Sequence, residues 1–366
     1  MKRIVWAYGR HINRTIRHLG DTFENHGYIL EPFSMVVPRW RKLPAMIVSA
    51  RWQEGHLRGF SSVHPWTYRH LKVPAHLQDW PVFVFGDMIL SSAPHFFYQD
   101  LNYKAILNDR LAGRKTFMYD DVPLPILKAQ VRVQHEHYAR VSQVFSMSHW
   151  AREAILATGA IDSKRVHVVG AGSNLGRVCL QNPYTEKNLD AKTLTFVGRD
   201  FVRKGGPLLL EAWHHVHRLM PAARLQLVGP GESLSDPQMN IVAVGDVNGD
   251  QVVSLLKRST GFVMPTQWEP YGIAFLEAFS CGVPAIGPAR MAIPEFLHDG
   301  QNGYIYSKDD PLVLADTMLR LLSNNEATWA LSRQAFLDSR NYTWERTFEK
   351  MARVLESRSD STMWFA

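Results

Sequence analysis

Short apolar runs alternate with amphipathic segments along the second half of the chain. The strand-like runs occupy residues 193–198, 223–229, 240–247, 261–266 and 283–287. Segments with an apolar residue every three or four positions lie between and after them, at 207–220, 250–259, 273–282 and 311–324. This alternation predicts a parallel sheet covered by helices, and the ligands of such doubly wound α/β domains bind at the carboxyl ends of the strands.

The first half of the chain is less regular. Apolar runs predict strands at residues 3–9, 80–90, 94–100 and 165–170. The Arg-, His- and Trp-rich stretches between these runs show no clear period, so their structure is left open. The polar segment 181–190 separates the two halves and is interpreted as a linker. A length of 366 residues also favours two domains.

Composition narrows the class of protein. The chain is 46% hydrophobic and has only two cysteines, Cys179 and Cys281, which excludes a disulfide framework and fits a reducing compartment. No apolar run approaches the roughly 18 residues of a membrane span, and the first ten residues are a poor signal peptide. We expect a cytoplasmic protein, either soluble or peripheral on the inner face of a membrane.

The net charge of +7 is unevenly distributed. Residues 1–185 contain 23 Lys and Arg against 13 Asp and Glu, whereas residues 186–366 contain 18 against 21. A basic first half could face anionic lipid, nucleic acid or an anionic acceptor. A scattered, solvated basic surface is the alternative.

A basic loop follows the strand expected at 193–198. The sequence VGRDFVRKGG places Arg199 and Lys204 beside the glycines Gly205 and Gly206, just before a helix. Two cations at a glycine turn and a helix N-terminus suit a diphosphate. The alternative interpretation is a basic loop that contacts only solvent.

Two glutamates lie eight positions apart in EPYGIAFLEAFSCGVPAIG. Glu269 precedes a predicted helix, and Glu277 lies on its first turns among apolar residues. The helix start at Gly272 and Ile273 would present free backbone N–H groups to an anion. One ligand could then meet Glu269, these N–H groups and Glu277, with Glu277 accepting hydrogen bonds from ribose hydroxyls. A structural salt bridge of Glu277 is the alternative.

A glycine-rich stretch at 168–176, VVGAGSNLG, offers a different hypothesis. It resembles a dinucleotide fingerprint, with Asp190 about 20 residues further on, and would indicate an NAD(P)-dependent oxidoreductase. No strand ends at Asp190, however, so a tight loop is the preferred interpretation. His135 and His137 are interpreted as an exposed helix edge, and not as metal ligands.

Several spaced motifs together resemble those of the retaining GT-B glycosyltransferases, a family that includes sucrose synthases, phosphatidylinositol mannosyltransferases and lipopolysaccharide core glucosyltransferases. The two glutamates with PYG and GVPAIG resemble its Glu-x7-Glu signature, and VGRDFVRKGG resembles its Gly-Arg…Lys-Gly element. RVHVVGAGSN, LQLVGPG, VAVGDV and PEFLHDGQNGYIY fall in the expected order. The resemblance covers about residues 141–356.

This resemblance implies a GT-B fold, in which two Rossmann-like domains face a deep cleft and the last helix crosses back. The acceptor-binding domain would be 1–182 with 343–366, and the donor-binding domain 188–342. The resemblance implies transfer of a hexose-type sugar from a nucleotide-diphospho-sugar (a UDP- or GDP-sugar) to a hydroxyl. Retention at the anomeric carbon, no cofactor and no metal are also implied.

The resemblance also assigns roles residue by residue. Arg199 and Lys204 would hold the diphosphate and stabilise the leaving group, Glu269 would contact the donor sugar, and Glu277 would bind the ribose. The other donor-side residues would be Gly198, Gly229, Val247, Pro270, Tyr271, Gly272 and Ile273.

The acceptor side departs from the family pattern. Gln99 and Asp100 stand where many relatives place a His, so Asp100 is the candidate for the fourth catalytic residue. The other acceptor-side candidates are Gly9, Arg10, Asn13, Gly172 and Asn174. The segment 36–46 mixes Trp40 with three cations, which suits a membrane interface, although a buried Trp among solvated cations is equally compatible. We expect a glycan, lipid-linked or lipopolysaccharide-type acceptor; modified phage DNA bases or an inactive scaffold are alternatives.

Overall fold

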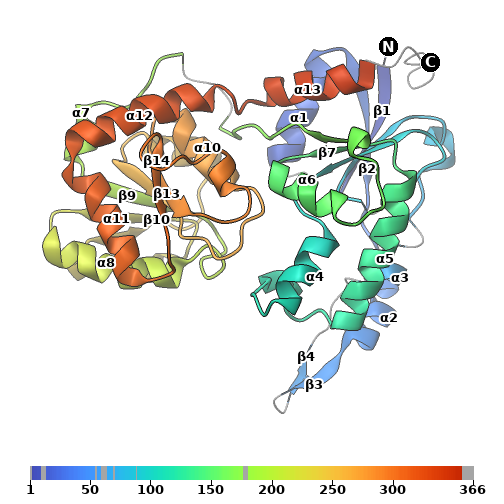
Figure 1. Cartoon of the computed structure of the whole chain (residues 1–366), viewed down its shortest axis with the longest axis horizontal. Coiled ribbons are helices and arrows are strands. Elements are labelled where there is room, and N and C mark those ends of the chain that lie inside the picture. The colour runs from blue at the N-terminus through green and yellow to red at the C-terminus, as the bar shows by residue number, and fades with distance from the viewer. Residues whose placement is uncertain are drawn as a thin grey trace. The chain divides into compact units, whose positions relative to one another are not determined.

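The chain forms two compact units. The computed structural model describes residues 2–9, 14–53, 56–58, 64–68, 71–87, 89–175 and 180–356. Unit 1 comprises Met1–Gly170 and Trp344–Ala366, and unit 2 comprises Ala171–Thr343 (Figure 1). Each unit contains a six-stranded parallel sheet with helices packed around it.

The sheet of unit 2 has the doubly wound order expected from its pattern. Its strands lie in the spatial order β11 (Ile241–Ala243), β10 (Arg224–Val228), β9 (Thr193–Val197), β12 (Gly261–Val263), β13 (Ala285–Pro288) and β14 (Gly303–Tyr306). All five pairings are parallel. The chain order reverses between β9 and β12, so the loops after these two strands meet at the topological switch point, where such sheets bind ligands.

Two helices of unit 2, α9 and α11, begin at side-chain caps that their sequences provide. Asp310 accepts hydrogen bonds from the first turn of α11, and Asn248 with Gln251 forms a capping box on α9. The helices of this unit are α7 (Glu186–Asp190), α8 (Gly206–Leu219), α9 (Gly249–Leu256), α10 (Ile273–Ser280), α11 (Pro311–Ser323) and α12 (Asn325–Ser339). The core that they cover includes fully buried Trp213, Phe262 and Phe279.

The segment 181–190 is not the linker that its polarity suggested. Tyr184 is buried and donates from its hydroxyl to the carbonyl of Thr260 at 2.8 Å. Asn188 donates to the carbonyls of Lys257 and Ser259. These polar groups satisfy buried backbone acceptors and hold the segment within unit 2. The boundary between the units therefore falls at Gly170, not within 181–190.

Unit 1 has a second parallel sheet. Its spatial order is β2 (Tyr28–Ser34), β1 (Lys2–Tyr8), β5 (Val82–Phe85), β6 (His95–Gln99), β7 (Gln143–Ser146) and β8 (Val166–Val168). Here the order reverses between β1 and β5. A separate antiparallel hairpin is formed by β3 (Arg51–Gln53) and β4 (His56–Arg58).

The last helix of the described chain returns to unit 1. On α13 (Trp344–Glu356), Phe348 packs edge-on against Phe23, with 4.8 Å between ring centroids, and also against Tyr28. The other helices of unit 1 are α1 (Arg14–Asn25), α2 (Arg39–Ser49), α3 (Pro65–Tyr68), α4 (Tyr103–Leu111), α5 (Leu124–Arg140) and α6 (His149–Leu156). None of the helices in the described ranges is both long and apolar enough to cross a bilayer.

Short 3-10 helices also occur in both units. They lie at Ala75–Leu77, Phe117–Tyr119, Ser163–Arg165, Glu232–Leu234, Pro237–Met239 and Ile293–Glu295.

Candidate functional site

Two loops are bonded together at the switch point of unit 2. The loop after β12 donates from the Gln267 N–H to the carbonyl of Arg203, in the loop after β9, at 2.9 Å. The Arg203 guanidinium returns a hydrogen bond to the carbonyl of Trp268 at 2.8 Å. Gly205 lets the two backbones meet, because a Cβ at this position would lie 1.7 Å from the carbonyl oxygen of Pro265. The loops therefore form one rigid platform.

Glu269 meets two cations on this platform. Its Oε2 lies 3.1 Å from Nη1 of Arg203 and 3.6 Å from Nζ of Lys204. All three side chains are largely shielded from solvent. Arg203 is also paired with Asp200 at 2.9 Å, so its charge is shared between two carboxylates. Among the described residues, Lys204 makes only long contacts, at 3.6 Å to Glu269 and to Sδ of Met264, so its ammonium keeps donors for an incoming anion.

Glycines allow the Lys204 side chain to lie against the strand ends. A Cβ on Gly198 would come within 2.2 Å of Cδ of Lys204. A Cβ on Gly229 would lie 2.7 Å from the carbonyl carbon of Gly198, and Gly229 has a φ of +108° that side chains rarely adopt. Gly198 and Gly229 thus keep the carboxyl ends of β9 and β10 open for Lys204.

Arg199 is differently placed from Lys204. Its side chain is 77% exposed, and its Nε is 2.9 Å from Oδ1 of Asp246, itself exposed. Val247 follows Asp246 in the loop between β11 and α9, where it is half-buried. An exposed ion pair of this kind contributes little stability. An anionic ligand can therefore replace Asp246 as the partner of Arg199.

The helix that carries Glu277 starts where the sequence predicted. Gly272 precedes α10 with a φ of +101°, and helix geometry leaves the N–H groups of Ile273 and Ala274 without acceptors inside the helix. Pro270 and Tyr271 are buried just before it. The Tyr271 hydroxyl accepts from the Ala171 N–H at 3.1 Å, and burial raises the pKa of this phenol.

Glu277 itself lies on α10 with only 9% of its surface exposed. It stands one turn beyond Ile273, where the sequence placed it.

The structure also places the acceptor-side candidates. Gly9 follows β1, with no atom within 4 Å of an added Cβ, whereas Arg10 and Asn13 lie outside the described residues. Gln99 is buried at the end of β6, and its Oε1 accepts from the Tyr138 hydroxyl at 2.9 Å. Asp100 is half-buried in the next position.

Gly172 and Asn174 belong to unit 2, and not to the first domain as expected. They lie in the stretch considered as a dinucleotide fingerprint. A fingerprint opens a helix directly after its strand, but residues 169–175 are loop after β8. The local structure therefore gives no support to a fingerprint here.

Three partners at this site escaped the sequence analysis. Arg203, Asp200 and Asp246 make the ion pairs that organise the loops after β9 and β11. Arg203 stands directly before Lys204, so the sequence did show a third cation in this loop. Only the fold shows that it contacts Glu269.

The two doubly wound units, the returning helix and the paired loops define a GT-B fold. WaaG, a glycosyltransferase involved in lipopolysaccharide biosynthesis, superposes with a TM-score of 0.69 at 16% identity, over 98% of this chain and all of that one. Anabaena HepE in complex with UDP-glucose superposes with a TM-score of 0.64 at 14% identity, over 98% and 100%. The expected fold class is confirmed.

The sequence is similar to known glycosyltransferases in the same region. Residues 191–324, which lie within unit 2, match the family described as Glycosyl transferases group 1. Among curated relatives, the gpi3 subunit of phosphatidylinositol N-acetylglucosaminyltransferase from Schizosaccharomyces pombe is 24% identical over 308 residues, which cover 79% of this chain and 66% of the relative. The chain spans about half the length of several other curated relatives that it matches.

Proposed function

We propose that this protein is a retaining glycosyltransferase that moves a hexose-type sugar from a nucleotide-diphospho-sugar to a hydroxyl acceptor. The pairing of Lys204 with Glu269 at the switch point of unit 2 carries this proposal. It puts a cation and a carboxylate where a doubly wound sheet binds ligands. The UDP-glucose bound by HepE, which shares this fold, supports a UDP-sugar as the donor.

Each part of the site would have a separate role toward the donor. Arg199, Lys204 and the N-terminus of α10 would bind the diphosphate, whose charge grows as it departs. Glu277 would accept from the ribose hydroxyls, and Glu269 would contact the sugar. The acceptor hydroxyl would attack the face that the diphosphate leaves. Cations that already neutralise the diphosphate make a metal unnecessary in this scheme, so we expect transfer to continue in the presence of a chelator.

Calorimetric titration without divalent metal tests the donor site. UDP, GDP, ADP and their common sugar conjugates would be compared, and we expect one nucleotide to bind. Glu277→Ala should weaken that binding, whereas Lys204→Ala should mainly lower turnover. Failure of every nucleotide to bind, or equal and mild effects of both substitutions, would contradict the proposal.

We further propose a glycolipid or lipopolysaccharide-type acceptor. The gpi3 subunit is named for transfer to phosphatidylinositol, and the structural neighbour WaaG is described as involved in lipopolysaccharide biosynthesis. The enzyme would then work at a membrane surface.

The exposed face of α2 supports this location. Only Ala45 and Ser49 of this helix are buried, whereas Trp40 and Ile47 are 65% and 69% exposed. Leu43 and Val48 are also exposed on it. Trp40 is therefore exposed, and the alternative of a buried Trp is wrong.

Cations accompany this apolar surface. They are Arg39, Arg41 and Lys42, and residues 32–53 contain no acid. Cations beside large exposed apolar groups fit an anionic bilayer surface.

Flotation with liposomes tests the membrane contact. We expect the protein to float with vesicles that contain anionic lipid and to remain behind with neutral ones. Trp40→Ala together with Ile47→Ser should abolish flotation, whereas Leu219→Ser, at an equally exposed position of unit 2, should not. Absence of binding at moderate salt would end the membrane part of the proposal without touching the donor site.

A further inference from the structure

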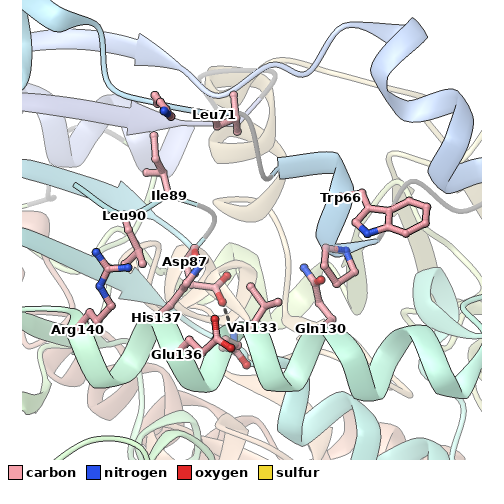
Figure 2. A pocket seen from close by; sticks show the side chains of 13 residues that line it. Trp66, Leu71, Asp87, Ile89, Leu90, Gln130, Val133, Glu136, His137 and Arg140 are labelled. Carbon is pink, nitrogen blue, oxygen red and sulfur yellow. Dashed lines mark hydrogen bonds between the residues drawn. The ribbon is translucent and has the colours of Figure 1, made fainter. Parts of the chain in front are cut away.

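Unit 1 contains a cavity of about 620 Å³ at the carboxyl end of β5 (Figure 2). One wall is a single face of α5, whose lining residues Gln130, Val133, Gln134 and His137 follow helical spacing. Asp87, Ile89 and Leu90, which follow β5, form a second wall. Because the strand order of this sheet reverses between β1 and β5, the cavity lies where a second ligand of the fold is expected.

Part of the lining is apolar and flat. Trp66 on α3 is about half exposed, and its ring lies 4.5 Å from that of His64. Leu71, Ile89 and Val133 add aliphatic surface, and Figure 2 shows Ile89 and Leu71 opposite the side chains that rise from α5. The flat indole and the aliphatic groups form a surface on which the C–H groups of a ligand's saturated ring can pack.

The polar part of the lining is held in place by its own hydrogen bonds. Asp87 is buried, and its Oδ2 accepts from Nε2 of Gln134 at 2.6 Å. Gln134 is itself oriented by the Tyr103 N–H, which donates to its Oε1 at 2.8 Å. His137 donates from Nδ1 to the carbonyl of Asp87, so Nε2 is the ring nitrogen that can bond to a ligand. Burial raises the pKa of the Asp87 carboxyl, so this group can also exist as a donor.

One buried polar atom in the cavity has no partner within the described chain. Gln130 is 93% buried, since its exposed fraction is 7%, and its Oε1 makes no hydrogen bond with any described residue. Figure 2 shows this side chain projecting from α5 toward Trp66. Leaving a buried amide oxygen unsatisfied costs about 1–3 kcal/mol. A ligand that donates a hydrogen bond would recover this energy.

The charges around the cavity favour neither an anion nor a cation. Two acids, Asp87 and Glu136, are matched by two bases, Lys72 and Arg140. The buried carboxyl and amide groups disfavour a purely apolar ligand. A neutral ligand with many hydroxyls and an apolar face satisfies all of these groups.

We infer that this cavity binds a neutral saccharide, with Gln130, Asp87 and His137 bonded to its hydroxyls and Trp66 against its ring. The volume accommodates one sugar residue or a short saccharide. The identification of this saccharide as the acceptor rests on the proposed function. The binding of a saccharide in the cavity does not depend on that function.

The test measures saccharide binding to the intact protein. Methyl glycosides of glucose, galactose, mannose and N-acetylglucosamine would be titrated at millimolar concentrations by saturation-transfer NMR. We expect at least one to bind and its affinity to fall about threefold to tenfold in Gln130→Leu, the cost of one hydrogen bond. His135→Ala, an exposed change on the same helix that does not line the cavity, should leave affinity unchanged. Trp66→Ala, at a half-exposed position, provides a second variant if Gln130→Leu does not fold.

The outcomes separate the two proposals. Binding of none of the glycosides, or equal affinities in the wild type and the Gln130→Leu and Trp66→Ala variants, overturns the saccharide site. Nucleotide titration of the same samples reports on unit 2, and Gln130→Leu should not alter it. Glycoside binding without nucleotide binding would keep the saccharide site and remove its role as acceptor site.

Discussion

Arg203 and Arg199 lie four positions apart but have opposite surroundings. Arg203 is largely buried and bonds to Asp200, Glu269 and the carbonyl of Trp268. Arg199 is exposed and has the exposed Asp246 as its ion-pair partner. The first arginine therefore holds the platform together, and the second is available to a ligand.

Substitution of each arginine by methionine should separate these roles. We expect Arg203→Met to lower the free energy of unfolding of unit 2 by about 1–3 kcal/mol, because it leaves a buried carbonyl and carboxylate poorly paired. Arg199→Met should change it by no more than about 0.5 kcal/mol and instead weaken nucleotide binding. Urea unfolding and calorimetric titration check both. Equal losses of stability would contradict the distinction.

Asp87 should make the stability of unit 1 depend on pH. Burial raises its pKa above the ordinary value of 3.8, against the opposing effects of His137 and Gln134. Protonation therefore favours the folded protein. The contribution of Asp87 is most favourable below pH 3.8 and is lost as the pH rises through the raised pKa.

Asp87→Asn should consequently be more stable than the wild type at neutral pH, with a difference that shrinks as the pH falls. The Asn Oδ1 can still accept from Gln134, so the packing is kept. Thermal unfolding of both proteins across the acidic range measures the difference, and repeating it in a His137→Gln background removes the coupled imidazole. A difference that grows on acidification would show that the carboxyl is stabilised as an anion.

At the scale of elements, the close approach of the loops after β9 and β12 depends on Gly205. Its φ is +80°, and a Cβ would meet the Pro265 carbonyl oxygen at 1.7 Å. We expect Gly205→Ala to lower the free energy of unfolding by about 3 kcal/mol or more, because the loops must separate.

Gly113→Ala is the matched control for this substitution. Gly113 has a similar φ of +72° but nothing within 4 Å of an added Cβ, so only backbone strain of about 1 kcal/mol should appear. Urea unfolding of both variants gives the comparison. Equal losses would mean that the close approach of the loops contributes nothing.

The elements differ in how well their sequences predict them. Those of unit 2 have buried apolar runs, and glycines stand directly before α8 and α10, so β9, α8 and α10 follow from pattern alone. In unit 1, β2 escaped prediction because it is an edge strand that contains Pro32 and alternates poorly between buried and exposed positions. β7 escaped because it has only four residues and is polar at both ends, Gln143 and Ser146.

The site shows the same limit. Lys204, Glu269 and Glu277 stand at spacings that the local sequence reveals. The contact between Arg203 and Glu269 joins loops 66 positions apart, and the saccharide cavity combines Trp66, Asp87 and Gln130 from three segments. Contacts between segments so far apart in the sequence depend on tertiary packing, which cannot be inferred from local residue spacing.

At the scale of the whole molecule, α13 completes unit 1 from the far end of the described chain. Phe348 is 95% buried, since its exposed fraction is 5%, and it contacts the rings of Phe23, His26 and Tyr28. Phe348→Ala should lower the free energy of unfolding of unit 1 by about 3–5 kcal/mol and leave that of unit 2 unchanged. Glu349→Ala, exposed on the same helix, should have little effect. Hydrogen exchange resolved by peptide would report each unit separately; loss of protection in unit 2 would contradict this prediction.

The return of α13 also has a consequence for synthesis on the ribosome. All of unit 2 lies between the last strand of unit 1 and α13, so unit 2 can complete its sheet and helices while Phe23 still lacks its contact with Phe348. Domains generally fold as they emerge, from the N-terminus onward. Here the second unit can be finished first, and the nascent first unit must keep an unsatisfied aromatic surface out of non-native contacts until residue 348 has emerged.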